Sequence, residues 1–425
     1  MTVVVFLGSL LGCIFLGIPV AFSLLLCGVA LMLQLNMVDF QIMAQNLISG
    51  ADSFPLLAIP FFVLAGELMN AGGISKRIVD LPLKLVGHKQ GGLGYVAIIA
   101  AVLMASLSGS AAADTAALGM VLLPMMKRAG YEPGDSAGLI ATGGIIAPII
   151  PPSIPFIIFG VVSGVSISKL FLAGIAPGIM MGLALGLVWW WRSRNVQLAR
   201  SEKATTAEIW HSVKEGAWAL LLPVIIVGGF RSGIFTPTEA GAVAAMYALV
   251  VALFVYREMK VKDLFEVLFA AAETTAIVML LVAASAVSAF LITLAELPLM
   301  VVELMQPLVD SPTLLMLCIM LFIMVVGMVM DLTPTVLILV PVLMPLIKDA
   351  GINPVYFGVL FILNCSIGLI TPPVGNVLNV ITGVSRLPFE VCVKGVLPYL
   401  SAMLGLLLLF TLFPSLILVP LKWIS

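Results

Sequence analysis

Charged residues are scarce in this chain of 425 residues, at 10% of the sequence, and histidine occurs only twice. Globular domains carry about 25% charged residues, so a chain that is 62% hydrophobic cannot cover a soluble surface. The formal net charge is −1, and the sequence contains no cluster of Lys and Arg. The composition therefore excludes a soluble domain and does not support a nucleic-acid partner.

The sequence also lacks the residue clusters that most enzymes and metalloproteins need. Its histidines, His88 and His211, lie in predicted loops, which makes a membrane-embedded enzyme a weak alternative. No GxxxxGK[ST] motif is present, so ATP hydrolysis within this chain is not expected. The five cysteines lie in apolar segments without metal-type spacing, and we interpret them as reduced packing residues. We expect neither an enzyme nor a bound cofactor.

Long apolar stretches dominate the rest of the sequence. Leu315–Met330 approaches the roughly 20 residues that cross a bilayer. Val3–Leu33 is too long for the core of a signal peptide and has no basic start or cleavage pattern, so we interpret it as retained transmembrane structure. We predict an all-α polytopic protein of the lipid bilayer.

A stretch of sequence occurs twice, once in each half. PMMKRAGYEP begins at Pro124 and PLIKDAGINP begins at Pro345, 221 positions later, with five of ten residues identical. The same offset relates Pro151-Pro152 to Pro372-Pro373 and Gly174 to Gly395. Internal repeats in so apolar a chain are typical of secondary transporters.

The charges of corresponding loops differ between the halves. The early loop 36–54 has no Lys or Arg and the segment after Asn70 is basic, whereas in the second half 257–262 is basic and 296–312 has only acids. Because basic loops stay in the cytoplasm, corresponding loops are predicted on opposite faces, with the N-terminus outside. Two inverted-topology repeats follow from this pattern, and a chance distribution of few charges is the alternative.

A polar stretch separates the two halves. Residues 192–216 carry five basic residues directly after three tryptophans, which is typical of a helix leaving the bilayer at the cytoplasmic face. We predict a first repeat over 1–191, a cytoplasmic connecting arm over 192–216 and a second repeat over 217–425. The arm is either a helix along the membrane surface or a solvated linker. Each repeat should contain scaffold helices, then a re-entrant hairpin and a broken transmembrane helix.

Two polar interruptions in each half indicate where a site should lie. Residues 106–115 and their mate 327–335 suit the tips of re-entrant hairpins. The adjacent prolines at 151–152 and 372–373 should break a helix and free backbone carbonyls, which suit a small cation such as Na⁺. The helix N-termini that follow favour an anion. We predict two cation sites with a substrate between them.

Acids inside apolar segments are candidates for function, because a carboxylate at a helix centre costs about 2.5–3.5 kcal/mol on insertion scales. Asp114 and Asp331 fit this description and are expected to face a cavity. Glu67 and Glu273 could instead bond backbone at a helix end. Arg231 is interpreted as interfacial, with a structural role equally open.

Four segments occur in an order that points to a known family. They are SLSGSAAADTAALG at 106–119, GGIIAPIIPPS at 143–153, GIFTPTEAGAVA at 233–244 and GLITPPVGNVLNV at 368–380. They resemble the large membrane subunit, DctM type, of tripartite ATP-independent periplasmic (TRAP) transporters, over essentially the whole chain. The resemblance implies Na⁺-driven uptake of an organic acid across the bacterial inner membrane by an elevator movement. It also implies two partners, a small four-helix membrane subunit and a periplasmic substrate-binding protein.

Carried over position by position, the resemblance implies cation-binding residues in both repeats. These are Ser106, Ser108, Asp114, Gly144, Ala147, Gly327, Cys365, Gly368 and Thr371. The substrate-binding positions that it implies are Ser110, Ser153 and Asp331. An acid that accepts substrate hydroxyls would favour a polyhydroxy acid over a plain dicarboxylate, although the sequence does not identify the acid. The alternative is a stand-alone ion- or proton-coupled antiporter with Asp114 and Asp331 as proton carriers.

Overall fold

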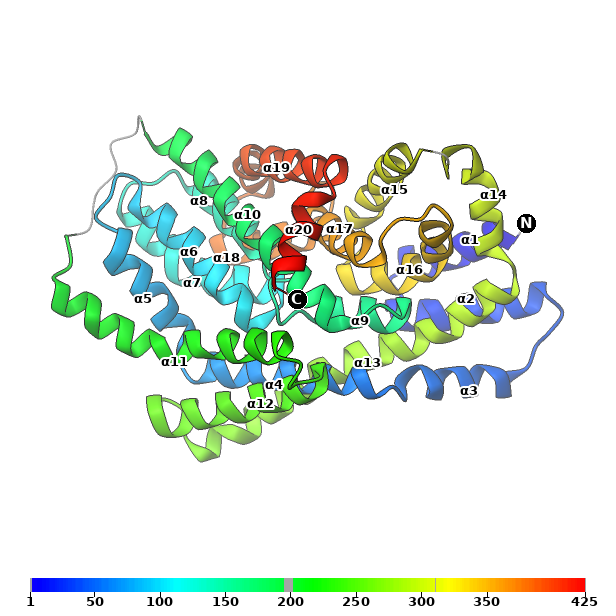
Figure 1. The fold of residues 1–425 in the computed structure, drawn as a ribbon, viewed down its shortest axis with the longest axis horizontal. Coiled ribbons are helices and arrows are strands. Elements are labelled where there is room, and N and C mark those ends of the chain that lie inside the picture. The colour runs from blue at the N-terminus through cyan, green and yellow to red at the C-terminus, as the bar shows by residue number, and fades with distance from the viewer. Residues whose placement is uncertain (1, 195–201, 310, 425) are drawn as a thin grey trace.

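The structure, a computed structural model, describes residues 2–194, 202–309 and 311–424, and the regular secondary structure in this part of the chain is helical (Figure 1). The helices of the first half are α1 (Thr2–Phe15), α2 (Val20–Gln34), α3 (Phe40–Ala51), η1 (Phe54–Leu57), α4 (Ala58–Ala71), α5 (Ile74–Val86), α6 (Gly92–Ser108), α7 (Ala111–Arg128), α8 (Pro133–Gly144), α9 (Ile154–Ser163) and α10 (Ile167–Ser193). Those of the second half are α11 (Thr206–Arg231), α12 (Pro237–Val250), η2 (Val251–Tyr256), η3 (Val261–Asp263), α13 (Leu264–Leu294), α14 (Leu297–Val309), α15 (Pro312–Gly327), α16 (Leu332–Asp349), α17 (Pro354–Gly368), α18 (Asn376–Ser385), α19 (Phe389–Leu412) and α20 (Ser415–Ile424).

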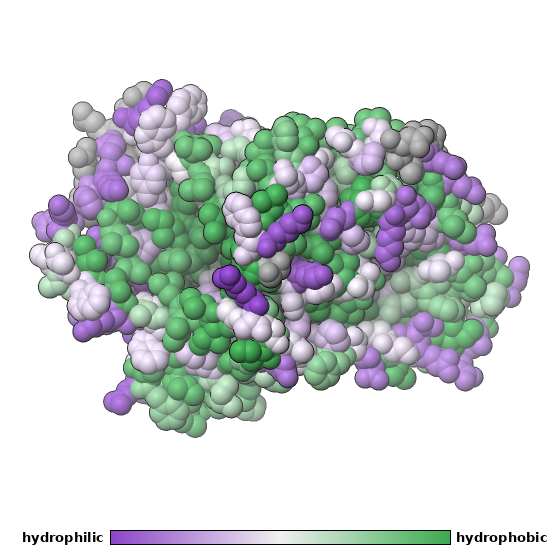
Figure 2. All heavy atoms as spheres, in the orientation of Figure 1, coloured by the Kyte–Doolittle hydropathy of each residue, from purple (hydrophilic) through white to green (hydrophobic). Residues whose placement is uncertain are grey.

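Seven of the described helical segments are long and apolar enough to cross a membrane, by length and composition. Large hydrophobic side chains lie on the outside of the molecule, as a lipid-facing surface requires. Figure 2 shows hydrophobic residues over much of one face, with hydrophilic ones towards both ends of the long axis and in a patch near the middle. The all-α, multi-pass class predicted from composition is confirmed.

The helix boundaries repeat with the offset of the sequence motif. Helix α7 begins at Ala111 and α16 begins at Leu332, 221 positions later, and their last residues are separated by the same offset. Helices α8 and α17 both begin at the proline of the repeated element, after the capping residues Glu132 and Asn353. Local capping and proline placement therefore start corresponding helices at corresponding positions.

Elements of one half pack against those of the other in a reciprocal pattern. Helix α7 contacts α18, and its mate α16 contacts α9; likewise α8 contacts α19 and α17 contacts α10. Residues far apart in the sequence thus lie side by side in the centre of the molecule (Figure 1). The hairpin of each half is supported by the broken helix of the other half.

The remaining helices form a second group around this unit. Helix α4 packs on α12, α13 packs on α2 and α3, and α11 packs on α5. Helix α5 then leads through Gly91, whose φ of 67° is in the left-handed region, into the first hairpin at α6. The connector α5 therefore joins the outer helices to the central unit.

Both ends of the connection predicted over 192–216 belong to helices. Helix α10 continues to Ser193 and α11 begins at Thr206, where a capping box joins Thr205 and Glu208. The capping box at its N-terminus explains why α11 begins in the polar stretch, and the helix then continues into the apolar stretch despite Pro223. Residues 195–201 lie outside the described part, and the division into 1–191, 192–216 and 217–425 stays a prediction.

Candidate cation and substrate site

The first hairpin is formed by α6 and α7, which meet at a left-handed glycine. Gly109 has a φ of 64° and joins α6 to Ser110, the N-cap residue of α7. A Cβ atom at Gly109 would lie 2.7 Å from the carbonyl oxygen of Pro152, in the break between α8 and α9. The hairpin tip is therefore pressed against the broken helix of its own half, and only glycine fits at the point of contact.

A polar network fills this tip. The Ser108 hydroxyl donates to Oδ1 of Asp114, and the backbone N–H of Ser110 donates to Oγ of Ser108 at 3.1 Å. Asp114 is 1% exposed, and its second carboxylate oxygen, Oδ2, is buried without a hydrogen-bond partner. A buried carboxylate oxygen without a partner is costly, so this geometry favours a cation beside Asp114.

A further buried oxygen atom lies between α7 and the end of α8. A Cβ atom at Gly144 would lie 1.9 Å from Oγ1 of Thr115, which is also buried without a partner. Helix α8 ends at Gly144. The carbonyl of Gly143 accepts from the N–H groups of Ile145 and Ile146, and that of Gly144 accepts from Ala147, so the four-residue spacing of the helix is lost here. Carbonyl and hydroxyl oxygens at a helix break are the ligands that transporters use for Na⁺.

The second hairpin, formed by α15 and α16, meets its broken helix through two glycines. A Cβ atom at Gly368 would lie 2.6 Å from the carbonyl carbon of Gly327, and the N–H of Gly375 donates to the carbonyl of Met328 at 3.3 Å. One residue before Cys365, Oδ1 of Asn364 is buried without a partner, while its Nδ2 donates to the carbonyl of Met320 at 2.6 Å. The second site thus consists of close backbone contacts with an unpaired amide oxygen nearby.

Asp331 lies at the tip of the second hairpin in a different environment from Asp114. It is exposed and is the N-cap residue of α16, where its Oδ1 accepts from the N–H of Leu332 at 2.8 Å. Its backbone carbonyl accepts from the hydroxyl of Thr335. The other carboxylate oxygen remains available to a ligand that enters at the tip.

With this geometry in place, comparison with known proteins becomes informative. Residues 7–416 match the family model described as "Tripartite ATP-independent periplasmic transporter, DctM component". The chain belongs to this DctM family. The resemblance inferred from the four motifs is confirmed.

Two relatives that are named as permease subunits match nearly the whole chain or all of it. The chain is 68% identical over 425 residues, 100% of both chains, to the 2,3-diketo-L-gulonate TRAP transporter large permease protein YiaN of Escherichia coli (strain K12). It is 40% identical over 405 residues, 95% of each chain, to the sialic acid TRAP transporter large permease protein SiaM of Vibrio cholerae. These relatives are permease subunits, which fits the expectation that this DctM-family chain is not an enzyme.

A solved structure resembles the fold despite low sequence identity. The YdaH transporter of Alcanivorax borkumensis, whose crystal structure is described as having an unusual topology, matches with a TM-score of 0.64. The two proteins are 13% identical, and the match covers 88% of each chain. The likeness shows that the DctM-family chain shares a transporter fold.

The structure places the remaining predicted site residues in the same two regions. The Ser106 hydroxyl, at the end of α6, donates to the carbonyl of Leu103 at 2.6 Å, and Ala147 is buried between α8 and α9. Thr371 donates to the carbonyl of Ile367 at 2.8 Å, after α17. Ser153 is buried, and its hydroxyl donates to the carbonyl of Pro148 at 2.5 Å while it caps α9. Their ligand roles stay predictions.

Sequence reasoning missed two residues of these regions. Thr115 follows the predicted Asp114 directly, and Asn364 precedes the predicted Cys365. Both carry buried oxygen atoms without a partner. The one available signal was position, because both are polar residues inside segments already assigned to a hairpin or a broken helix.

Proposed function

We propose that this chain is the large permease subunit of a secondary transporter that couples the entry of Na⁺ to the uptake of an organic acid. The proposal rests on buried side-chain oxygen atoms without hydrogen-bond partners at the first hairpin tip. There, Oδ2 of Asp114 and Oγ1 of Thr115 are both buried without a hydrogen-bond partner, and Thr115 packs against Gly144 at the end of α8. A Na⁺ ion at this point supplies the missing partners for both oxygens.

Na⁺ and substrate binding are coupled through the hairpin tips. The network from Asp114 through Ser108 reaches the backbone of Ser110, the predicted substrate residue. A cation bound to Asp114 holds this network, and therefore the tip, in one arrangement. A second Na⁺ site, built from Gly327, Gly368 and the oxygens around Cys365, does the same for the second hairpin.

The proposed substrate is an acid that carries several hydroxyl groups. Asp331 is exposed at the second tip and has one carboxylate oxygen free to accept hydroxyl hydrogen bonds. The N-termini of α7 and α9, capped by Ser110 and Ser153, offer positive dipole ends to the carboxylate of the substrate. The substrates for which YiaN and SiaM are named, diketogulonate and sialic acid, are of this class.

The wider arrangement follows from the family and the packing. The word tripartite in the family description supports two further components, which we take to be a small four-helix membrane subunit and a periplasmic substrate-binding protein. We place the chain in the bacterial inner membrane as two inverted repeats. The central unit of hairpins and broken helices then moves as an elevator against the outer helices, because its reciprocal contacts hold it together.

Reconstitution into liposomes tests the proposal. The chain should take up a labelled sugar acid only with the small subunit and the loaded binding protein present, and only with an inward Na⁺ gradient. Uptake driven by a pH gradient without Na⁺ would instead support the proton-coupled alternative. Uptake by the chain alone, without either partner, would contradict the tripartite assembly.

A further inference from the structure

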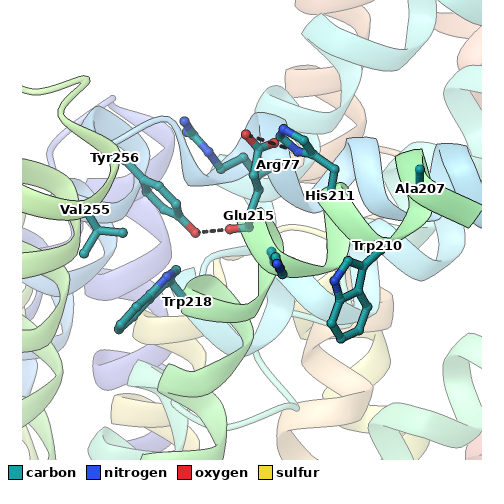
Figure 3. Close-up of a pocket in the computed structure, with 9 residues that line it drawn as sticks. Arg77, Ala207, Trp210, His211, Glu215, Trp218, Val255 and Tyr256 are labelled. Atoms are coloured by element: carbon teal, nitrogen blue, oxygen red, sulfur yellow. Dashed lines mark hydrogen bonds and ion pairs between the residues drawn. The ribbon is translucent and has the colours of Figure 1, made fainter.

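A second polar cavity lies outside the transport site, where α5, α11 and η2 meet. Its volume is about 550 Å³. It is lined by Arg77, Ala207, Trp210, His211, Lys214, Glu215, Trp218, Val255 and Tyr256 (Figure 3). None of these residues belongs to the hairpins or the broken helices, so the transport site does not account for the cavity.

The cavity offers hydrogen-bond donors that the described residues leave unpaired. The Arg77 side chain pairs with Glu258 at 2.7 Å and bonds the carbonyl of Gly73 at 3.1 Å, but its Nε is buried without a partner. Within the described part of the chain, no carboxylate lies within ion-pair distance of Lys214, whose Nζ is 5.6 Å from the ring centroid of Trp210. The cavity therefore presents the exposed cation of Lys214, next to an Arg77 guanidinium that lies 4.0 Å from the ring centroid of Tyr256.

Each of the two acidic residues beside the cavity, Glu258 and Glu215, has an arginine or a histidine next to it. Glu258 is paired with Arg77, and Oε1 of Glu215 lies 3.6 Å from Nδ1 of His211. The backbone carbonyl of Glu215 accepts from the Tyr256 hydroxyl, as Figure 3 shows. Glu258 is paired with Arg77 and Glu215 has His211 beside it, so Lys214 is the group here that can bind an anion with several acceptor oxygens, such as a phosphodiester.

An exposed apolar strip continues from the cavity along α11. Trp218 lines the cavity and is 45% exposed, and the next residues along this surface, Leu221 and Val224, are 41% and 64% exposed. Phe254, next to the lining residue Val255, is also exposed. Tryptophan and tyrosine beside basic residues are typical of the membrane–water interface. An anionic group bound in the cavity would thus have an apolar surface for attached acyl chains.

We propose that this cavity binds the head group of an anionic phospholipid. The phosphate accepts from Lys214, and the acyl chains lie along Trp218 and Leu221. Basic pockets beside membrane-spanning helices bind acidic lipid head groups in this way. Because Arg77 belongs to α5, the connector that leads into the first hairpin, the bound lipid holds this connector against α11.

Native mass spectrometry of the full chain in detergent tests the proposal with phosphatidylglycerol as the probe. Wild-type protein should retain phosphatidylglycerol in preference to phosphatidylethanolamine, and millimolar inorganic phosphate should not displace it. Lys214→Gln removes one exposed charge and should weaken retention about fivefold. The matched control Lys203→Gln, an exposed lysine outside the cavity, should leave retention unchanged.

Four results would overturn the proposal. Equal retention by Lys214→Gln and wild type would show that the cavity does not hold the head group, and equal losses in both lysine variants would indicate diffuse surface attraction. Displacement by inorganic phosphate would identify a site for free anions. If the small membrane subunit expels the lipid and Lys214→Gln weakens binding of that subunit, the surface is a protein interface.

Discussion

The two hairpin tips have the same architecture and opposite placements of their acids. At the first tip Asp114 is buried, bonded to Ser108 and left with one unpaired oxygen. At the second tip Asp331 is exposed, and the position equivalent to Asp114 is Thr335, which bonds the backbone instead. A repeated backbone therefore carries two different chemical environments.

This difference suggests a division of roles. A buried carboxylate needs a compensating cation, whereas an exposed carboxylate at a helix N-terminus can exchange its hydrogen bonds with water or a ligand. The second half compensates for its missing buried acid with the close approach of Gly327 and Gly368, which brings two backbone segments together. We expect Na⁺ binding at the first tip to depend on the charge of Asp114. At the second tip we expect it to depend on the close approach of the Gly327 and Gly368 backbones.

The largest effect is expected at the glycine contact. Gly368→Ala places a methyl group 2.6 Å from the backbone of Gly327, so it should destabilise the protein by about 1–3 kcal/mol and abolish Na⁺-dependent uptake. The matched control is Gly383→Ala on α18, where a Cβ atom meets nothing within 4 Å. Thermal unfolding and uptake in liposomes measure both effects. Normal uptake by Gly368→Ala would show that the second tip tolerates a wider separation between the backbones of Gly327 and Gly368.

The next effect concerns charge at the first tip. Asp114→Asn keeps the shape of the side chain but removes its charge, and a hydrogen bond or contact to a charged group contributes about 1.5–3 kcal/mol. The Na⁺ concentration for half-maximal uptake should therefore rise at least about tenfold. Thr335→Ala, at the equivalent position, should leave it unchanged within about twofold. Equal Na⁺ dependence in both variants would contradict the division between the tips.

At the second tip, Asp331→Asn should act on the substrate instead. It halves the acceptor capacity for hydroxyl groups, so uptake of a sugar acid at limiting concentration should fall about tenfold, with the Na⁺ dependence retained. Affinity of the isolated binding protein for the substrate is the control and should not change. Full uptake by this variant would leave Asp331 with its capping bond to Leu332 as its only role.

The smallest effect is expected at Thr115. Thr115→Val removes a buried hydroxyl that has no partner in the protein, so thermal stability should be unchanged or slightly higher. The half-maximal Na⁺ concentration should rise about two- to tenfold, because one ligand oxygen is lost. The equivalent residue, Val336, is already apolar, and Val336→Thr provides the reciprocal test. A stability loss without a Na⁺ effect would make Thr115 a packing residue.

Much of the architecture could be predicted because local sequence features determine where helices begin and end. Prolines, glycines and capping residues recur at a fixed offset, and the hairpin tips and helix breaks lie where these residues occur. The different burial of Asp114 and Asp331 could not be predicted, since both stand in similar apolar sequence. Burial at the tips depends on which helix covers them, as the contact of Thr115 with Gly144 illustrates. Such tertiary contacts cannot be predicted from the periodicity of hydrophobic residues in the sequence.

The reciprocal packing of α7 on α18 and of α16 on α9 has an evolutionary consequence. Each half covers with the other half a surface that it cannot cover by itself, which is the arrangement that two half-length chains would form as a symmetric pair. Within one chain the two copies can diverge, because a substitution alters one tip and leaves the other unchanged. One copy could acquire a buried acid while the other kept its acid at the surface.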